Sequence, residues 1–328
     1  MNWADIAWQL PAGIVFLALG GDLLVRGSST LAERLGMSRL LIGVTLVSFG
    51  TSMPEMMASV QAALRDSPGI AVGNVVGSNI ANILLVLGAA ALIYPLATPR
   101  VVMRHNGIVV LMATAVCVGV VLFGHLDRVV GAMLVGLLIG YFVWGYFRDR
   151  HVLQHETENG SGQQEGASGS VWGALFLAVA GLALVLLGAH WLVDSSIELA
   201  REFDISESII GLTVVAIGTS LPELITSVIA AFRRETALAL GNVLGSNVQN
   251  ILGILGVTAL VHPIDVPADI AAFDIWVMVA ATVALLVFAT TRRCLSRLEG
   301  FLLLLAYVIY IGYLGYIALG VGAAQIPA

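Results

Sequence analysis

The chain has 328 residues, of which 59% are hydrophobic and only 11% are charged, and its formal net charge is −6. Soluble globular proteins carry about 25% charged residues, so this composition excludes a soluble domain. Apolar runs of about 20 residues, the length that crosses a bilayer core, recur throughout, and we therefore expect an all-α polytopic membrane protein embedded in a lipid bilayer.

Taken in chain order, the apolar runs predict about ten transmembrane helices. Their approximate ranges are 11–34, 40–64, 70–94, 105–124, 127–147, 172–200, 208–232, 238–261, 270–290 and 298–319. Residues 148–171, between the fifth and sixth runs, are rich in Gly, Ser, Gln and Glu and predict a flexible linker. The chain thus divides into residues 1–147, the linker 148–171 and residues 172–328, with five helices in each half.

A sequence repeat relates the two halves. Residues 43–88 and 211–256 align without a gap at an offset of 168 residues and are identical at more than half of their positions. Because each half crosses the membrane an odd number of times, the second copy enters from the opposite side. The sequence therefore predicts an inverted-topology repeat, the architecture of many secondary transporters.

The arginines predict an orientation. The chain has no lysine, and with these spans eleven of its fifteen arginines fall on the side of the linker, against Arg65, Arg128 and Arg201 on the other side. Positive residues are enriched on the cytoplasmic side of membrane proteins. We therefore expect a multi-pass protein integral to the cell (inner) membrane, with the linker in the cytoplasm and both termini outside.

The second predicted helix contains Gly50-Thr51-Ser52-Met53-Pro54-Glu55. Pro54 has no amide hydrogen, and its ring clashes with the carbonyl four residues earlier, so we expect the helix to break and to leave nearby carbonyls, such as that of Ser48, without helical partners. The hydroxyls of Thr51 and Ser52 add further oxygens. Oxygens gathered in this way are the ligands that hard cations prefer.

The seventh predicted helix repeats this arrangement as Gly218-Thr219-Ser220-Leu221-Pro222-Glu223. By the same reasoning we expect the carbonyl of Ala216 and the hydroxyls of Thr219 and Ser220 to be available as oxygen ligands. We therefore expect two broken helices, the second and the seventh, with equivalent sets of oxygens.

Glu55 and Glu223 each follow a proline, in the first turn of a half-helix, where the helix dipole favours a negative charge. An ionised glutamate near the middle of a membrane still costs at least about 2.5 kcal/mol without a partner. The nearest arginine to Glu55 is Arg65, so a bound cation is the natural partner. The alternative is a protonated, hydrogen-bonded glutamate that serves packing alone.

The third and eighth predicted helices carry a stripe of small polar residues. Asn74, Ser78 and Asn82 are spaced by four residues and lie on one helix face, and Asn242, Ser246 and Asn250 repeat the pattern. We expect Ser78, Asn82, Ser246 and Asn250 to line the site. Helix packing is at least as good an explanation for the neighbouring glycines and for Asn79 and Asn247.

Several other functions lack support in the sequence. It has no phosphate-binding glycine loop, no Cys/His cluster of metal-binding spacing and no nucleophile–base arrangement. We therefore expect a protein that is not an enzyme, needs no cofactor, and binds neither nucleotide nor nucleic acid. No obligate protein partner is indicated.

The two repeated stretches resemble the α-repeats of the cation/calcium exchanger superfamily, which includes the sodium/calcium exchangers. The resemblance rests on Gly-Thr-Ser-x-Pro-Glu followed by Gly-Asn-x-x-Gly-Ser-Asn, present twice. It implies that the second, third, seventh and eighth helices build a central site, and that the first and sixth helices slide to alternate access. It also implies calcium-binding carboxylates at Glu55 and Glu223, with subsites completed by Thr51, Ser52, Thr219, Ser220, Ser78, Ser246 and carbonyls near Ser48 and Ala216.

The sequence and the resemblance together predict a secondary active antiporter that exchanges Ca²⁺ for Na⁺ by alternating access. Many exchangers of this superfamily have an aspartate where this chain has Asn250, opposite Asn82, so the core carries only two carboxylates and K⁺ dependence is disfavoured. A proton-coupled or K⁺-dependent exchanger on the same fold is the main alternative. A passive cation channel and a non-transporting scaffold are the others, and flux measured against each counter-ion separates them.

Overall fold

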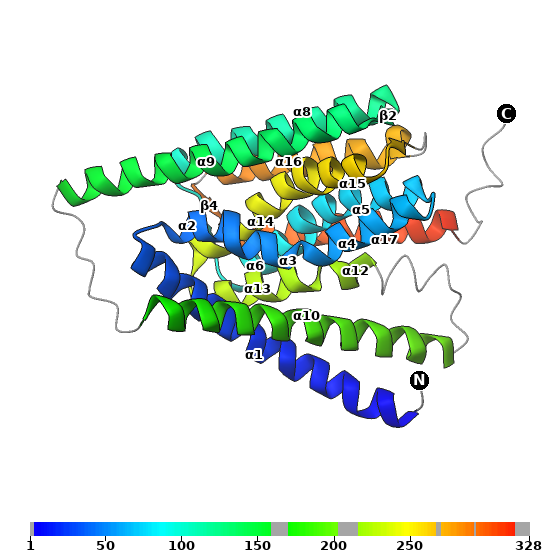
Figure 1. Cartoon of the computed structure of the whole chain (residues 1–328). Helices are drawn as coiled ribbons and strands as arrows, with labels where there is room; N and C mark the ends of the chain where they lie inside the picture. The colour runs from blue at the N-terminus through cyan, green and yellow to red at the C-terminus, as the bar shows by residue number, and fades with distance from the viewer. Residues whose placement is uncertain (1–2, 159–169, 203–215, 267–269, 292, 319–328) are drawn as a thin grey trace.

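The computed structural model describes residues 3–158, 170–202, 216–266, 270–291 and 293–318, a part of the chain made of helices, short connections and four two-residue strands (Figure 1). The first half contains α1 (Trp3–Leu35), α2 (Arg39–Ile42), η1 (Gly43–Val47), α3 (Ser48–Thr51), α4 (Met53–Leu64), α5 (Pro68–Ala81), η2 (Asn82–Leu87), α6 (Gly88–Ile93), β1 (Leu96–Ala97), α7 (Arg100–Val102), η3 (Met103–Gly107), α8 (Ile108–Phe123), β2 (His125–Leu126) and α9 (Arg128–Glu158), where η denotes a π-helical segment.

The second half repeats much of this order. It contains α10 (Val171–Glu202), α12 (Ala216–Thr219), α13 (Leu221–Phe232), α14 (Thr236–Gln249), η5 (Asn250–Ile254), α15 (Leu255–Val261), β3 (Ile264–Asp265), η6 (Ile270–Asp274), α16 (Ile275–Thr291), β4 (Cys294–Leu295) and α17 (Arg297–Ala318). The π-helical segments η2 and η5 begin at the equivalent residues Asn82 and Asn250, so the local distortion of the helix is itself part of the repeat.

The predicted all-α polytopic membrane fold is confirmed. In the described part, eight helices are long and apolar enough to cross a membrane, and residues 39–51 and 53–64 form a further span with a bend of 45°. The predicted span 208–232 is represented by α12 and the short apolar helix α13, while its residues 208–215 lie outside the described part.

The predicted linker is wrong at its start. α9 continues without interruption to Glu158, and α10 begins at Val171, so residues 148–158 are helical. Polar residues alone do not end a helix, and the first glycine after Arg128–Glu158 that could do so is Gly160. Residues 159–169 of the predicted linker lie outside the described part.

Two short antiparallel ribbons show the inverted relation between the halves. Leu96 of β1 pairs with Leu295 of β4, and Leu126 of β2 pairs with Ile264 of β3. β1 and β3 are equivalent in the repeat, yet their ribbons lie at opposite ends of the molecule, as the labels of β4 and β2 show in Figure 1. The equivalent hydroxyls of Thr114 and Thr282 lie 3.2 Å apart, close to the axis that relates the halves.

The helices that carry the stripe of asparagines and serines form the centre of the molecule. Of an 18-residue apolar stretch within the span 236–261, 89% is buried inside the protein, and the share is 72% within 68–93. The buried share is only 22% in the outer spans 128–149 and 297–317. Large apolar side chains such as Met112, Val129 and Val308 are exposed on the outer helices, as expected where lipid replaces water. The repeated motif therefore lies where neither lipid nor bulk water reaches it.

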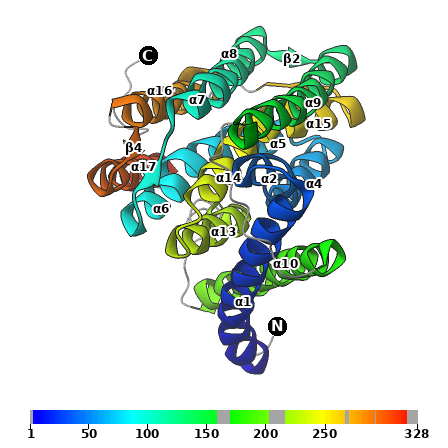
Figure 2. The ribbon, with the colours of Figure 1, turned by 90° about the vertical axis from the view of Figure 1, so that its left-hand side faces the viewer.

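α1 and α10 run antiparallel beside each other along one edge of the bundle (Figures 1 and 2). Small residues seven positions apart face each other along the contact, which we call the glycine seam: Gly13, Gly20 and Gly27 of α1, and Ala174, Gly181 and Gly188 of α10. A Cβ on Gly20 would lie 2.8 Å from the carbonyl oxygen of Gly181, and one on Gly27 would lie 2.4 Å from the amide nitrogen of Ala178. The two backbones are in direct contact there, in the manner of small-residue interfaces between membrane helices.

Candidate cation-binding site

The predicted break in the second span lies at Ser52. α3 ends at Thr51 and α4 begins at Met53, with Pro54 in the first turn, and Ser52 has φ −84° and ψ 7°. The seventh span breaks in the same way at Ser220, with φ −90° and ψ 6° and Pro222 in the first turn of α13. Both breaks follow from the proline, which cannot donate to the carbonyl four residues earlier.

The carbonyl of Ser48 does not behave as the sequence suggests. It accepts a hydrogen bond from the Ser52 amide at 3.0 Å, so the expectation that it has no partner is wrong. The break falls one turn later, which leaves the Ser48 carbonyl inside the helical hydrogen-bond pattern. Ala216 is the first described residue of α12, and residues 203–215 before it lie outside the described part.

Glu55 and Glu223 are both 1% exposed, in the first turns of α4 and α13. The Ser52 hydroxyl donates to Glu223 Oε1 at 2.9 Å, so the break of one half touches the carboxylate of the other. None of the ion pairs formed by the described residues involves either glutamate. The structure therefore brings the two repeated motifs together around two carboxylates, with which no cationic side chain of the described part forms an ion pair.

Several buried polar atoms of the two repeated motifs lack a hydrogen-bond partner of good geometry. Among the described residues these are Glu55 Oε1 and Oε2, Glu223 Oε2, Asn82 Oδ1, both Oδ1 and Nδ2 of Asn250, and the hydroxyls of Ser220 and Ser246. The pairing of segments crosses between the halves, because α4 packs against η5, which begins at Asn250, and α13 packs against η2, which begins at Asn82. A buried unsatisfied polar group costs about 1–3 kcal/mol, more when it is charged, so the two carboxylates call for a positive partner.

The first asparagine of each stripe holds the broken helices in place. Asn74 Nδ2 donates to the Glu55 carbonyl at 2.9 Å and to the Ser59 hydroxyl at 2.8 Å. Asn242 Nδ2 donates equivalently to the Glu223 carbonyl at 3.4 Å and to the Ser227 hydroxyl at 2.9 Å. Both side-chain amides thus fix the backbone that carries a glutamate.

Asn79 and Asn247 serve their own helices. Each Nδ2 donates to the carbonyl four residues earlier, that of Val75 or Val243, at 2.8 Å. These bonds fit the packing role weighed for the two residues above. Asn79 and Asn247 are therefore not counted among the residues expected to line the site, which are Ser78, Asn82, Ser246 and Asn250.

The hydroxyl residues of the motif differ in their surroundings. Ser78 and Ser246 are buried, at 5% and 0% exposure. The Thr51 hydroxyl donates to the Val47 carbonyl at 3.1 Å and lies 3.3 Å from Asn242 Oδ1, so it is directed partly toward its own helix. Thr219 is half-buried.

Gln249 is a further buried polar residue at this place, and the sequence reasoning missed it. It is 0% exposed, its Oε1 lies 3.2 Å from the Ser48 hydroxyl, and its Nε2 has no partner among the described residues. Its equivalent in the first half is Ala81, just as Ala216 is the equivalent of Ser48. The replacement of an alanine by a glutamine within the repeat was the available signal.

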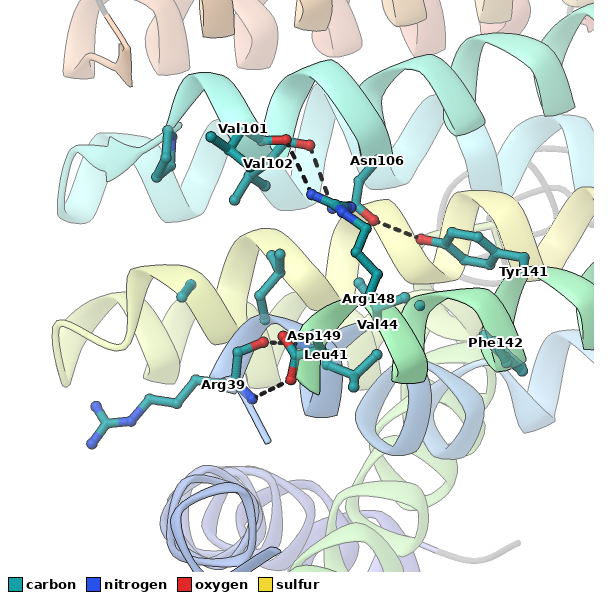
Figure 3. A pocket seen from close by; sticks show the side chains of 15 residues that line it. Arg39, Leu41, Val44, Val101, Val102, Asn106, Tyr141, Phe142, Arg148 and Asp149 are labelled. Carbon is teal, nitrogen blue, oxygen red and sulfur yellow. Dashed lines mark hydrogen bonds between the residues drawn. The ribbon is translucent and has the colours of Figure 1, made fainter. Parts of the chain in front are cut away.

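A separate cavity of about 500 Å³ opens near the end of α9, between α2, α7 and α9 (Figure 3). The amide of Ser38 donates to Asp149 Oδ2 at 2.7 Å on its wall, and the Tyr141 hydroxyl donates to Asn106 Oδ1 at 3.1 Å. The cavity reaches Val44, whose carbonyl accepts the Ser48 hydroxyl at 2.6 Å. It contains none of the predicted site residues but ends one helical turn from them.

Comparisons with known proteins agree with this architecture. The family model described as "Sodium/calcium exchanger protein" matches residues 6–147 and 173–316. The sodium/calcium exchanger MaX1 of Methanosarcina acetivorans is 34% identical over 346 residues, covering 94% of this chain and 98% of that protein. The inner membrane protein YrbG of Escherichia coli is 33% identical over 315 residues, covering 94% and 96%. A solved structure of the sodium-calcium exchanger NCX_Mj, soaked with 10 mM Na⁺ and 10 mM Sr²⁺, superposes with a TM-score of 0.81 at 34% identity, covering 95% of this chain and 99% of that one.

Proposed function

Because the chain belongs to the sodium/calcium exchanger protein family, a family of transporters and not of enzymes, we propose that it is a secondary antiporter that exchanges Ca²⁺ for Na⁺ by alternating access. The observation that carries this proposal is the pair of buried carboxylates, Glu55 and Glu223, together with the unpartnered polar groups of both repeated motifs. Sodium/calcium exchange is also what the names of MaX1 and NCX_Mj state for those relatives.

The charge of the site favours Ca²⁺ over a single monovalent ion. Two ionised glutamates carry two negative charges, and removing them from water costs several kcal/mol each, of the order expected for buried ions, unless a cation offsets it. One Ca²⁺ neutralises both, and so do two Na⁺. An empty site would hold two repelling carboxylates within the membrane, so the protein should change its access more readily when either ion set is bound.

The proposed ligands come from both halves. Carboxylates of Glu55 and Glu223 bind Ca²⁺, and neutral oxygens complete the calcium and sodium subsites, since hard cations take six or more oxygen ligands. The proposed neutral ligands are Thr51, Ser52, Ser78, Asn82, Thr219, Ser220, Ser246 and Asn250, with the carbonyl of Ala216. No resident cofactor is part of this proposal, because Ca²⁺ and Na⁺ are the transported substrates.

We place the protein in the inner membrane of the cell, with the end of the molecule where α9 ends and α10 begins in the cytoplasm. The start of α1 and the end of α17 lie at one end of the molecule, and the end of α9 and start of α10 lie at the other (Figure 1). Arginines such as Arg39, Arg148 and Arg233 belong to this second end, which supports a cytoplasmic assignment. The name of the E. coli relative, an inner membrane protein, agrees with it.

Removal of either carboxylate tests the proposal. Sodium-loaded vesicles that contain the wild-type protein should take up ⁴⁵Ca²⁺ when diluted into Na⁺-free buffer, and Glu55→Gln and Glu223→Gln should reduce this uptake to background while the protein stays folded. Asp127→Asn is the matched control, because Asp127 Oδ1 accepts from the Val130 amide at the start of α9 and asparagine caps a helix as well as aspartate. Normal uptake in either glutamine variant would contradict the assigned site. Uptake driven by a pH gradient without Na⁺ would identify a proton-coupled exchanger, and flux without any counter-ion would identify a channel.

A further inference from the structure

A buried polar pair breaks the symmetry of the site. Ser48 and Gln249 are both 0% exposed and lie 3.2 Å apart, measured from the Ser48 hydroxyl to Gln249 Oε1. Both equivalent residues of the other half, Ala216 and Ala81, are alanines. The pair therefore exists on one side of the approximate two-fold axis and has no counterpart on the other.

Hydrogen-bond counting sets the direction of the Gln249 amide. The Ser48 hydroxyl has a single proton, and the Val44 carbonyl at 2.6 Å takes it in preference to the amide oxygen at 3.2 Å. The Ser48 oxygen can then only accept, which requires the amide nitrogen of Gln249 to face it. Turning the amide group by about 180° exchanges its oxygen and nitrogen, so that Nε2 donates to the Ser48 hydroxyl oxygen. The side-chain carbonyl oxygen of Gln249 then takes the former position of Nε2, where no partner lies among the described residues.

We propose that the Gln249 carbonyl oxygen is a ligand for Na⁺, at a subsite beside the two glutamates that the other half of the site does not possess. The proposal rests on the proposed function. The last turn of α14 and the residue after it supply further oxygens without donors in the described part, Ser246 Oγ and Asn250 Oδ1. Ser246, Gln249 and Asn250 thus each carry an atom that has no partner among the described residues, and the neighbouring half-helix supplies Ser48 as the anchor of the Gln249 amide.

A neutral ligand at this place serves Na⁺ and not Ca²⁺ for an electrostatic reason. A single divalent ion is bound best where it touches both carboxylates. Two monovalent ions repel each other and cannot share that position, so at least one of them must move to the side and needs additional oxygen ligands there. An amide oxygen provides such a ligand without adding negative charge. It therefore does not strengthen Ca²⁺ binding to the point that Ca²⁺ is retained when it should be released.

The subsite lies on the side of the glutamates that faces the end of α9 and the start of α10. Ser48 precedes Glu55 by two turns in the span that starts at Arg39, at that end of the molecule. The carbonyl of Val44 joins Ser48 to the wall of the 500 Å³ cavity in Figure 3. Gln249 is therefore linked through Ser48 and Val44 to the wall of this cavity.

The test replaces Gln249 by methionine, which has nearly the same length but no oxygen. Gln249→Met should raise the Na⁺ concentration for half-maximal Na⁺-driven ⁴⁵Ca²⁺ release by about two- to ten-fold, the effect of one net polar contact. Ca²⁺–Ca²⁺ exchange in Na⁺-free buffer should change by less than about two-fold, which also shows that the variant is folded. Thr282→Val removes a buried hydroxyl outside the site and should leave the Na⁺ dependence unchanged.

An unchanged Na⁺ dependence in Gln249→Met, or an equal loss of Na⁺-driven release and Ca²⁺–Ca²⁺ exchange, would overturn the inference and leave the proposed function intact. If Gln249→Met does not fold, Ser48→Ala should shift the Na⁺ dependence in the same direction, and no shift there overturns the inference. If the wild type shows no Na⁺-driven Ca²⁺ flux, the proposed function fails. In that case the subsite is tested by comparing how much Na⁺ raises the melting temperature of the purified wild type and of Gln249→Met. Equal increases in the two proteins would overturn the inference.

Discussion

The glycine seam allows a prediction whose size follows from the structure. A Cβ on Gly181 would lie 2.3 Å from the amide nitrogen of Leu24 and 2.7 Å from the carbonyl oxygen of Gly20. Non-bonded carbon contacts need about 3.5 Å, so Gly181→Ala must part α1 and α10 by about 1 Å. Both contacting atoms belong to backbone, which cannot move aside as a side chain can, and overpacking of this kind costs about 1–3 kcal/mol.

Alanine also has the higher helix propensity, by about 1 kcal/mol, which works against this cost. Gly140→Ala in α9 isolates that effect, because a Cβ there has no neighbour within 4 Å. We expect Gly181→Ala to lower the melting temperature of the purified protein and to slow the initial rate of ⁴⁵Ca²⁺ uptake, while Gly140→Ala matches or exceeds wild-type stability.

The half-saturating Ca²⁺ concentration of Gly181→Ala should stay close to that of the wild type, because α1 and α10 contribute none of the proposed ligands. A variant that is as stable and as fast as the wild type would refute the close backbone contact. A loss of rate in Gly140→Ala equal to that in Gly181→Ala would show that the seam is not its cause.

Two further predictions concern the charge and the rigidity of the site. Wild-type ⁴⁵Ca²⁺ uptake should be the same with and without K⁺, and an absolute K⁺ requirement in the wild type would refute the role given to Asn82 and Asn250. Asn250→Asp adds a third carboxylate and should make uptake depend on K⁺ or on pH between 5 and 8. Asn74→Ala and Asn242→Ala each remove donors to a glutamate carbonyl and a serine hydroxyl. Each variant should therefore destabilise the protein by about 1–3 kcal/mol in thermal unfolding and weaken Ca²⁺ binding. Unchanged stability in both variants would show that these bonds do not hold the broken helices.

Local chemistry explains which features of the fold could be predicted from the sequence. The break at Pro54 depends on one missing amide and one steric clash, and both act within a single turn, so the bend in the second span could be placed closely. The burial of Glu55 follows from the apolar residues on either side of it. The inverted arrangement follows from the repeat offset and from an odd number of spans.

Contacts between distant segments could not be predicted in this way. The Ser48–Gln249 pair joins residues 201 positions apart, and their proximity depends on the crossing of η1 and α14. That crossing is close because Gly245 has no side chain, since a Cβ there would lie 2.5 Å from the Val44 carbonyl oxygen. The pairing of β1 with β4 is equally non-local. Composition alone placed the start of the linker eleven residues too early, because the polar residues after Asp149 remain compatible with a helix.

The two ribbons also constrain how the protein can be made. Each ribbon takes one strand from each half, and the partner of Leu96 is Leu295, just before the final helix. A ribosome releases the first five helices into the membrane long before this partner exists. The first half must therefore wait with an unpaired strand, at the end of the molecule where α9 ends, until nearly all of the second half has been inserted. Closure of that end is then one of the last steps of biogenesis. The ribbon at the opposite end, between Leu126 and Ile264, can form earlier, so the nascent protein is joined first at one face of the membrane and afterwards at the other.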